Sequence, residues 1–130
     1  MKISSLVIGS AMRRSILSIG LVLSLTAAPA LADGLFAAIA FSPVTGQSGG
    51  SWNYDSEAAA KTEAFASCGA EDCDTVLVFQ QCGAIAVGDG FGMGFAADQS
   101  SATAQDIATA NCTEFTSGCV VTLSFCNEGF

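Results

Sequence analysis

Carboxylates and cysteines are the residues that could carry chemistry, because the 130-residue sequence contains no histidine. The absence of histidine excludes Ser-His-Asp and Cys-His catalysis and the usual catalytic zinc ligands. The only dense acidic cluster is Glu71-Asp72-Cys73-Asp74, whose carboxylates could supply the acid and base of a glycoside hydrolase. The same oxygens could bind calcium, although their spacing matches no EF-hand loop. An exposed acidic turn explains the cluster more simply, so we predict no catalytic residue, metal or cofactor.

Six cysteines are the other reactive side chains, and we expect all of them to be structural. The sequence contains no Cys-x-x-Cys, and Lys61 is the only basic residue after position 32 that could stabilise a reactive thiolate. Exported domains of this size commonly hold their cysteines as disulfides, because a short chain builds only a marginal core.

A glycine-rich segment, Gly88-Asp89-Gly90-Phe91-Gly92, has some likeness to a phosphate-binding loop. It precedes a predicted strand rather than a helix, and it lacks the lysine of a P-loop. We therefore interpret Gly88–Gly90 as a hairpin turn. The alternation of glycine with large residues that follows indicates that a backbone or helix approaches the bare side of that strand.

The chain is organised around a pattern that occurs twice. Ala38-Ile39-Ala40-Phe41 reappears 46 residues later as Ala84-Ile85-Ala86-Val87, and an alanine-rich run ends in a cysteine in each half. The cysteines correspond in order, so that Cys68, Cys73 and Cys82 match Cys112, Cys119 and Cys126. We therefore predict an internal duplication, with units at about residues 35–82 and 83–126.

The duplication restricts the disulfide pairing. If a pseudo-twofold axis relates the units, the pairing must map onto itself when the units exchange, and several pairings satisfy this condition. Among them we choose Cys68–Cys73, Cys112–Cys119 and Cys82–Cys126. The first two would tie a helix end to the start of the following strand, and the third would join the ends of two equivalent strands.

Each unit is predicted to fold as strand, strand, helix, strand. The helices carry alanine-rich stripes, Ala60, Ala64, Phe65 and Cys68 in the first and Ala104, Ile107, Ala108 and Cys112 in the second. Residues 75–79 form the most continuously apolar strand, which favours a central position. Together the units predict an α+β fold, in which a mixed, largely antiparallel sheet of about six strands has both helices on one face.

Residues 1–32 have the features of an export signal. Basic residues precede an apolar run that is too short to span a bilayer, and Ala30-Leu31-Ala32 is a small-x-small cleavage site. Arg13-Arg14 leaves the twin-arginine route open as an alternative. We expect residues 33–130 to form a single secreted or periplasmic domain, without membrane insertion after the signal is removed.

The charge of this predicted domain is strongly negative. All twelve acidic residues follow residue 32, whereas Lys61 is the only basic residue there, so the net charge is −11. Such a balance repels nucleic acid and anionic lipid surfaces. It favours a cationic partner, or it serves solubility alone.

Four aromatic residues form the candidate contact surface: Trp52, Tyr54, Phe91 and Phe95. Trp52 and Tyr54 should share one side of a short strand. The two phenylalanines lie in the strand that follows the predicted hairpin turn, and the repeat places them near the equivalent positions of the second half. Exposed rings stack on sugars or fill pockets in a partner, and aromatic residues are frequent interface anchors. The alternative is that these rings form the core beneath the helices.

Three separated motifs resemble one bacterial family. They are Ala38–Ser42, Ser51–Tyr54 leading into Ala58-Ala59-Ala60, and Cys82–Gly88, and together they resemble the domain of unknown function 4189. The resemblance covers most of residues 35–126 and implies a small exported domain with no established activity or catalytic residues. Relatives often carry tryptophan where this hairpin has Phe91, Met93 and Phe95.

These observations predict a non-enzymatic, disulfide-rich binding module. Its expected partner is a cationic envelope or host protein, or a cell-wall component. Two alternatives remain open: a small cell-envelope hydrolase using carboxylates such as those of Glu71, Asp72 and Asp74, and a purely structural envelope domain.

Overall fold

The computed structural model describes residues 34–130, and the predicted signal sequence therefore lies outside the described residues. The first half contains β1 (Phe36–Phe41), β2 (Ser48–Tyr54), α1 (Glu57–Cys68) and β3 (Asp74–Phe79). The second contains β4 (Cys82–Val87), a 3₁₀ turn η3 (Asp89–Phe91), β5 (Met93–Asp98), α2 (Ser101–Thr113) and β6 (Val120–Cys126). Each half has the predicted order of strand, strand, helix, strand.

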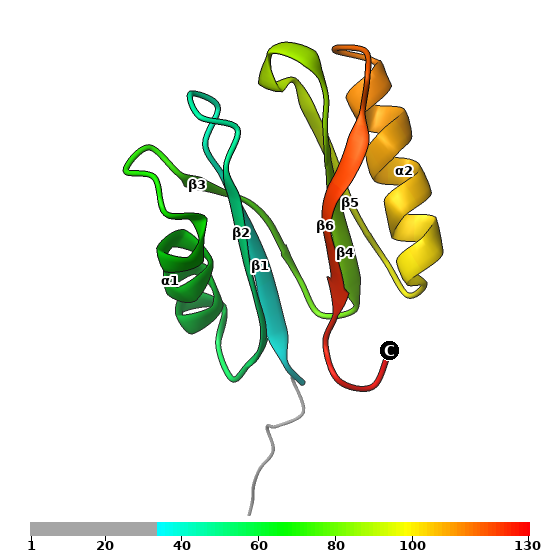
Figure 1. Ribbon diagram of the computed structural model, residues 1–130. Coiled ribbons are helices and arrows are strands. Elements are labelled where there is room, and N and C mark those ends of the chain that lie inside the picture. The colour runs from blue at the N-terminus through cyan, green and yellow to red at the C-terminus, as the bar shows by residue number, and fades with distance from the viewer. Residues whose placement is uncertain (1–33) are drawn as a thin grey trace, which may run out of the picture. The chain divides into compact units, whose positions relative to one another are not determined.

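The six strands form two antiparallel sheets that face each other between the two helices (Figure 1). In the first sheet β1 lies between β2 and β3, and in the second β4 lies between β5 and β6. Helix α1 packs on the outer face of the first sheet and α2 on that of the second. The α+β class is confirmed, but the strands form two three-stranded sheets rather than one, and the helices lie on opposite outer faces.

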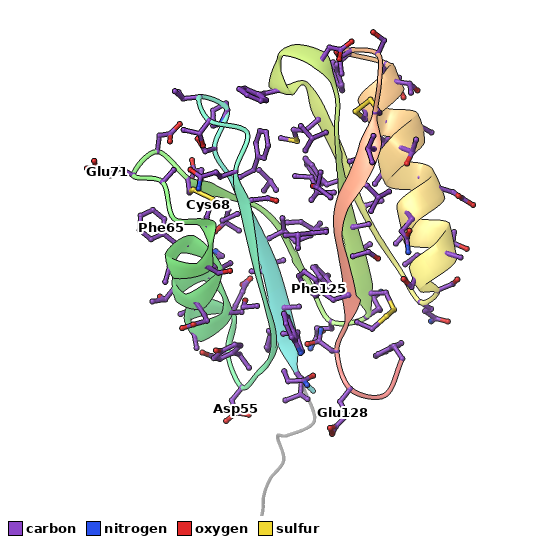
Figure 2. The ribbon with its side chains drawn as sticks, in the orientation of Figure 1. Asp55, Phe65, Cys68, Glu71, Phe125 and Glu128 are labelled. Carbon is purple, nitrogen blue, oxygen red and sulfur yellow. A yellow bond between two sulfur atoms is a disulfide. The ribbon has the colours of Figure 1, made fainter. Side chains whose placement is uncertain are left out.

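The division into two sheets follows from the two apolar faces of each central strand. In β1, Ala38 and Ala40 pack beneath α1, whereas Ile39 and Phe41 point away from it and are buried with Ile85 of β4. One sheet with both helices on a single face would leave the second apolar face in water. Two stacked sheets bury these faces against each other, and Phe125 lies between them in Figure 2.

Both helices begin at a serine cap and bury a stripe of small residues. Ser56 Oγ accepts a hydrogen bond from the Ala59 N–H at 3.1 Å, and Ser100 Oγ accepts one from the Thr103 N–H at 3.3 Å. The buried stripes are Ala60, Ala64 and Cys68 on α1, and Ala104, Ala108 and Cys112 on α2. Because these side chains are small, the helix backbones lie close to the sheets.

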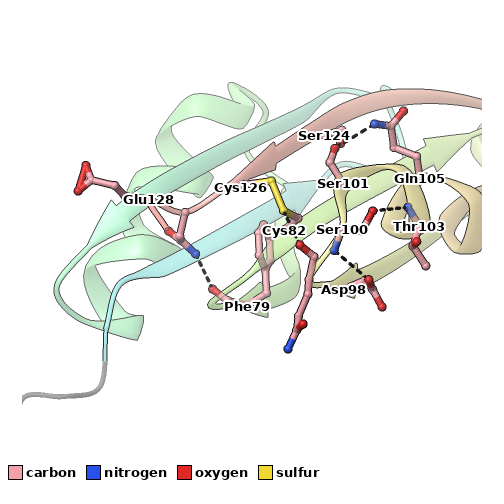
Figure 3. Close-up of a disulfide and its surroundings, with 12 residues drawn as sticks. Phe79, Cys82, Asp98, Ser100, Ser101, Thr103, Gln105, Ser124, Cys126 and Glu128 are labelled. Carbon is pink, nitrogen blue, oxygen red and sulfur yellow. Dashed lines mark hydrogen bonds between the residues drawn. A yellow bond between two sulfur atoms is a disulfide. The ribbon is translucent and has the colours of Figure 1, made fainter. Parts of the chain in front are cut away.

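Three disulfides join Cys68 to Cys73, Cys112 to Cys119 and Cys82 to Cys126. These are the three pairs chosen from the repeat. The two short bridges connect the end of each helix to the region of the following strand. The long bridge connects residues that lie opposite each other on β4 and β6 (Figure 3).

Asn127, directly after β6, ties the two sheets together from a buried position. Its Nδ2 donates to the Phe79 carbonyl at 3.2 Å (Figure 3), and its Oδ1 accepts from the Asn53 N–H at 2.8 Å. The Asn53 Oδ1 in turn accepts from the Glu128 N–H at 2.7 Å. Asn53 has a φ of 65°, a left-handed conformation that asparagine tolerates better than most residues.

We expect Asn127→Ala to lower the free energy of unfolding by about 1–3 kcal/mol, because it leaves the Phe79 carbonyl and the Asn53 N–H, both in the first sheet, without the side chain that ties them to the end of β6. Urea unfolding followed by circular dichroism measures this loss. Asn111→Ala is the matched control, because Asn111 makes a peripheral hydrogen bond to the Phe95 carbonyl at 3.2 Å and alanine favours its helix. Equal midpoints for the two variants would contradict the role given to Asn127.

Candidate functional site

Trp52 is half exposed, with 51% of its surface accessible, and yet its ring is supported from behind. Its centroid lies 5.1 Å from that of Phe125 of β6, which lies 5.5 Å from that of Phe79 of β3. The Phe125 ring also lies directly over Gly50, where any side chain would collide with it. These tilted ring contacts support one side of the indole at the edge of the sandwich and leave about half of it in water.

A β-bulge separates the contacts of Trp52 and Tyr54. Tyr54 pairs with Phe36 and Ser51 pairs with Ala38, so the register between β1 and β2 shifts at Trp52 and Asn53. Trp52 consequently packs on Phe125, whereas Tyr54 packs against the core beneath α1. The predicted common side of the strand is therefore not formed, although both rings reach one hollow at the edge of β2.

This hollow has a volume of about 210 Å³ and lies between β2 and α1. Its lining residues are Gly50, Ser51, Trp52, Tyr54, Glu63 and Ser67. The buried Ser51 Oγ donates to the Ala60 carbonyl at 2.6 Å, which fixes the strand to the helix. Among the described residues, no hydrogen bond or ion pair engages the side-chain oxygens of Tyr54, Glu63 and Ser67. A ligand in the hollow would therefore meet free polar groups beside an aromatic surface.

The two predicted phenylalanines lie elsewhere. Phe95 lines a separate hollow of about 280 Å³ beside the last turn of α2, together with the exposed Phe115. The Phe91 ring lies against Gly46 in the loop between β1 and β2. The structure thus brings Trp52 and Tyr54 together, but it does not join them to Phe91 and Phe95 in one surface.

The largest of these hollows, about 520 Å³, was not predicted. Its lining residues are Phe36, Glu57, Val78, Phe79, Gln80, Gln81, Gln99 and Phe130. Cys82 pairs with Asp98, so the pairing of β4 with β5 brings Gln81 and Gln99 to the same end of the second sheet. The available sequence signal was the pair Gln80-Gln81, which directly follows the strand predicted at residues 75–79.

Carboxylates border this amide-rich cleft. Glu57 lines it, Asp98 precedes Gln99, and Figure 2 shows Asp55 and Glu128 at the same end of the sandwich. Residues 34–130 contain eleven acidic residues, and Lys61 is the only basic one. No ion pair joins the described residues. The cleft therefore offers hydrogen-bonding amides in a negative environment.

The predicted acidic cluster has a local structural role. Asp72 accepts a hydrogen bond at Oδ1 from the buried hydroxyl of Ser42, at 2.7 Å, which ties the β1–β2 loop to the disulfide loop. In the second half, Asp89 Oδ2 accepts a hydrogen bond from Ser117 Oγ at 3.1 Å, which ties η3 to the loop closed by the Cys112–Cys119 disulfide. Within residues 34–130, no group of three or more cysteine or carboxylate side chains could hold a metal ion.

Residues 36–126 match the family described as Domain of unknown function (DUF4189). The chain belongs to this family. The resemblance carried by the three sequence motifs is thereby confirmed, and the fold described above is that of a DUF4189 domain. All six cysteines are paired, as is typical of proteins that fold outside the reducing cytoplasm. No helix within residues 34–130 is long and apolar enough to cross a membrane.

Several mycobacterial proteins are similar to this DUF4189 domain. Protein Rv1269c and Protein MT1307 of Mycobacterium tuberculosis and Protein Mb1300c of Mycobacterium bovis are each 43% identical over 58 residues. The match covers 45% of this chain and 46% of each relative, so it spans about half of their length. The NMR structure of Rv1813c from Mycobacterium tuberculosis shares 27% identity, with a TM-score of 0.58 over 76% of this chain and 80% of that one.

Proposed function

We propose that this DUF4189 domain is a secreted or periplasmic, non-catalytic binding module whose partner is a cationic protein. The observation that carries the proposal is the unpaired negative charge of residues 34–130, where eleven carboxylates have one lysine and no ion pair. Complementary charge accelerates encounter and selects the partner, whereas an acidic partner would be repelled. The amide-rich cleft gives such a partner a concave surface to enter.

The two alternatives have less support. A hydrolase would need two of the Glu71, Asp72 and Asp74 carboxylates to be directed at a substrate. Asp72 is already bonded to Ser42, and Glu71 is the only carboxylate that lines the hollow of about 240 Å³ beside it. A purely structural domain would gain nothing from a half-exposed tryptophan, because burying an aromatic ring stabilises a small core. The binding module accounts for both the charge and the exposed ring.

A basic probe protein such as lysozyme is expected to bind saturably, with roughly tenfold lower affinity in about 0.15 M salt than in about 0.01 M salt, because salt screens exposed charges. Titration calorimetry at several salt concentrations measures this dependence. The same titration with an acidic protein of similar size should show no saturable binding. Affinity that is independent of salt, or no affinity for basic proteins at all, would refute the proposal.

Removing one carboxylate tests whether the cleft itself is used. Glu57 lines the cleft, and Glu57→Gln is expected to lower the affinity for the basic probe protein about threefold. Asp106→Asn is the matched control, because Asp106 is exposed on α2 and lines none of the hollows described above. If the two variants lose affinity equally, the partner responds only to net charge and the cleft is not its binding site.

A further inference from the structure

The hollow beside Trp52 has features that charge alone does not explain. An indole that is half in water forgoes part of the stabilisation that burial would provide. Nevertheless, Phe125 supports it at 5.1 Å and Gly50 leaves room for that support. The ring is therefore supported on one side before any ligand arrives, and such preorganisation reduces the entropy lost on binding.

The polar side of the hollow is also fixed in place. Glu63 and Ser67 lie one turn apart on α1, so both side chains project from the same face of the helix. The hydrogen bond from Ser51 Oγ to the Ala60 carbonyl holds that helix against β2. A carboxylate and two hydroxyl groups, those of Tyr54 and Ser67, thus line the same hollow as Trp52 and have no partner among the described residues.

An indole beside an unpaired carboxylate suits a planar cation. Cations bind over the face of tryptophan within about 6 Å of its centroid, and arginine combines such stacking with two parallel hydrogen bonds to a carboxylate. A neutral sugar could also stack on the ring, but it would leave the charge of Glu63 uncompensated. The volume of about 210 Å³ is below the range of about 300–1,000 Å³ for drug-sized ligands, so it suits a single side chain.

We propose that the hollow formed by Trp52, Tyr54, Glu63 and Ser67 binds an arginine side chain of the cationic partner. The guanidinium stacks on Trp52 and donates to Glu63, while the hydroxyls of Tyr54 and Ser67 accept at the margin. This inference rests on the proposed function, since it names the anchor through which the partner is held. Tryptophan, tyrosine and arginine are the residues most often found at such anchors.

Trp52 is the only tryptophan, so its fluorescence reports on the hollow directly. N-acetyl-arginine amide is expected to quench it saturably, with a dissociation constant on the order of 1 mM for so small a ligand. N-acetyl-norleucine amide, which lacks the charge, and methyl glucoside, which tests a sugar site, should give no saturable change. Saturable quenching by the glucoside but not by the arginine probe would overturn the proposal in favour of a carbohydrate site.

Variants of the hollow complete the test. Glu63→Gln is expected to lower the affinity for the arginine probe about tenfold, because it removes the charge-assisted bidentate contact with the guanidinium. Asp106→Asn removes an equal charge from α2 and should leave quenching unchanged. Trp52→Leu retains an apolar contact for Phe125 but removes the aromatic face. It should lower the affinity for the basic probe protein, measured by calorimetry, about tenfold. Equal quenching of the natural protein and Glu63→Gln would overturn the assignment of Glu63.

The failure of this inference can be distinguished from the failure of the proposed function. If the basic protein binds in a salt-dependent manner but neither Trp52→Leu nor Glu63→Gln affects it, the arginine site is refuted and the binding function stands. If the arginine probe quenches Trp52 but no basic protein binds, the site stands and the proposed function is refuted.

Discussion

Removing the Cys82–Cys126 disulfide is expected to lower the free energy of unfolding by about 4 kcal/mol, compared with about 2 kcal/mol for Cys68–Cys73. The long bridge spans 44 residues and the short one spans 5, so the long bridge restricts the unfolded chain more strongly. Folding of a domain this small typically leaves only about 5–15 kcal/mol of stability. Loss of the long bridge should therefore remove a large share of that total.

The folded state adds a second reason to expect this order. Cys82 and Cys126 lie opposite each other on β4 and β6, and Asn127 follows directly to join the two sheets. Without the bridge, the end of β6 and the Asn127 contacts would fray together. The Cys82→Ala/Cys126→Ala variant is compared with Cys68→Ala/Cys73→Ala by urea unfolding of each protein. If the first pair loses no more stability than the second, the long bridge is not the main covalent constraint.

The repeat allowed the local elements and the disulfide pairs to be predicted from the sequence, because the elements and the two short bridges occur once in each half and the long bridge joins two matching positions. The pairing of strands into sheets was harder to predict. Residues 75–79 were expected to form a central strand because Val76 to Phe79 are all apolar, but β3 is an edge strand. Val76 and Leu77 are apolar because the opposing sheet covers them. The hydrophobicity of a strand indicates that its faces are buried. It does not indicate whether the strand has one hydrogen-bonded neighbour or two, because a stacked sheet can also cover a face of an edge strand.

Helix periodicity overestimated the size of the buried stripes. Phe65 and Ile107 fall on the predicted stripes, but 48% and 40% of their surfaces are exposed. The buried positions are alanines and cysteines, such as Ala64 and Ala108, which bring the helix too close to the sheet for a large side chain. Periodicity identifies the direction of a side chain but not the gap into which it must fit.

The candidate site shows a similar limit. Trp52 and Tyr54 were predicted on one side of a strand, and simple alternation would place them there. The bulge at Trp52 and Asn53 inserts one extra residue and changes which contacts each ring makes. The sequence signal for this bulge is weak, because it depends on Asn53 adopting a positive φ and on bonds to residues 127 and 128, far along the chain.

Gly49→Ala is expected to destabilise the protein by about 3 kcal/mol or more, at the upper end of what overpacking costs in a core. A Cβ on Gly49 would overlap the backbone nitrogen of Cys68, at the end of α1. A flexible side chain could turn aside, but a helix backbone held by the Cys68–Cys73 bridge has little freedom to move. The result should be a displaced helix and a lower urea midpoint.

Gly94→Ala should produce a loss of similar size, because a Cβ on Gly94 would overlap the backbone nitrogen of Cys112 at the matching end of α2. Gly90→Asn is the control: no atom lies within 4 Å of its added Cβ, and asparagine tolerates the φ of 64° found there. Matching losses at positions 49 and 94, with little loss at 90, would show that both halves depend on the same close helix–sheet contact. An unchanged midpoint for Gly49→Ala would mean that α1 can move outward at little cost, and the close packing would then not be what holds each helix to its sheet.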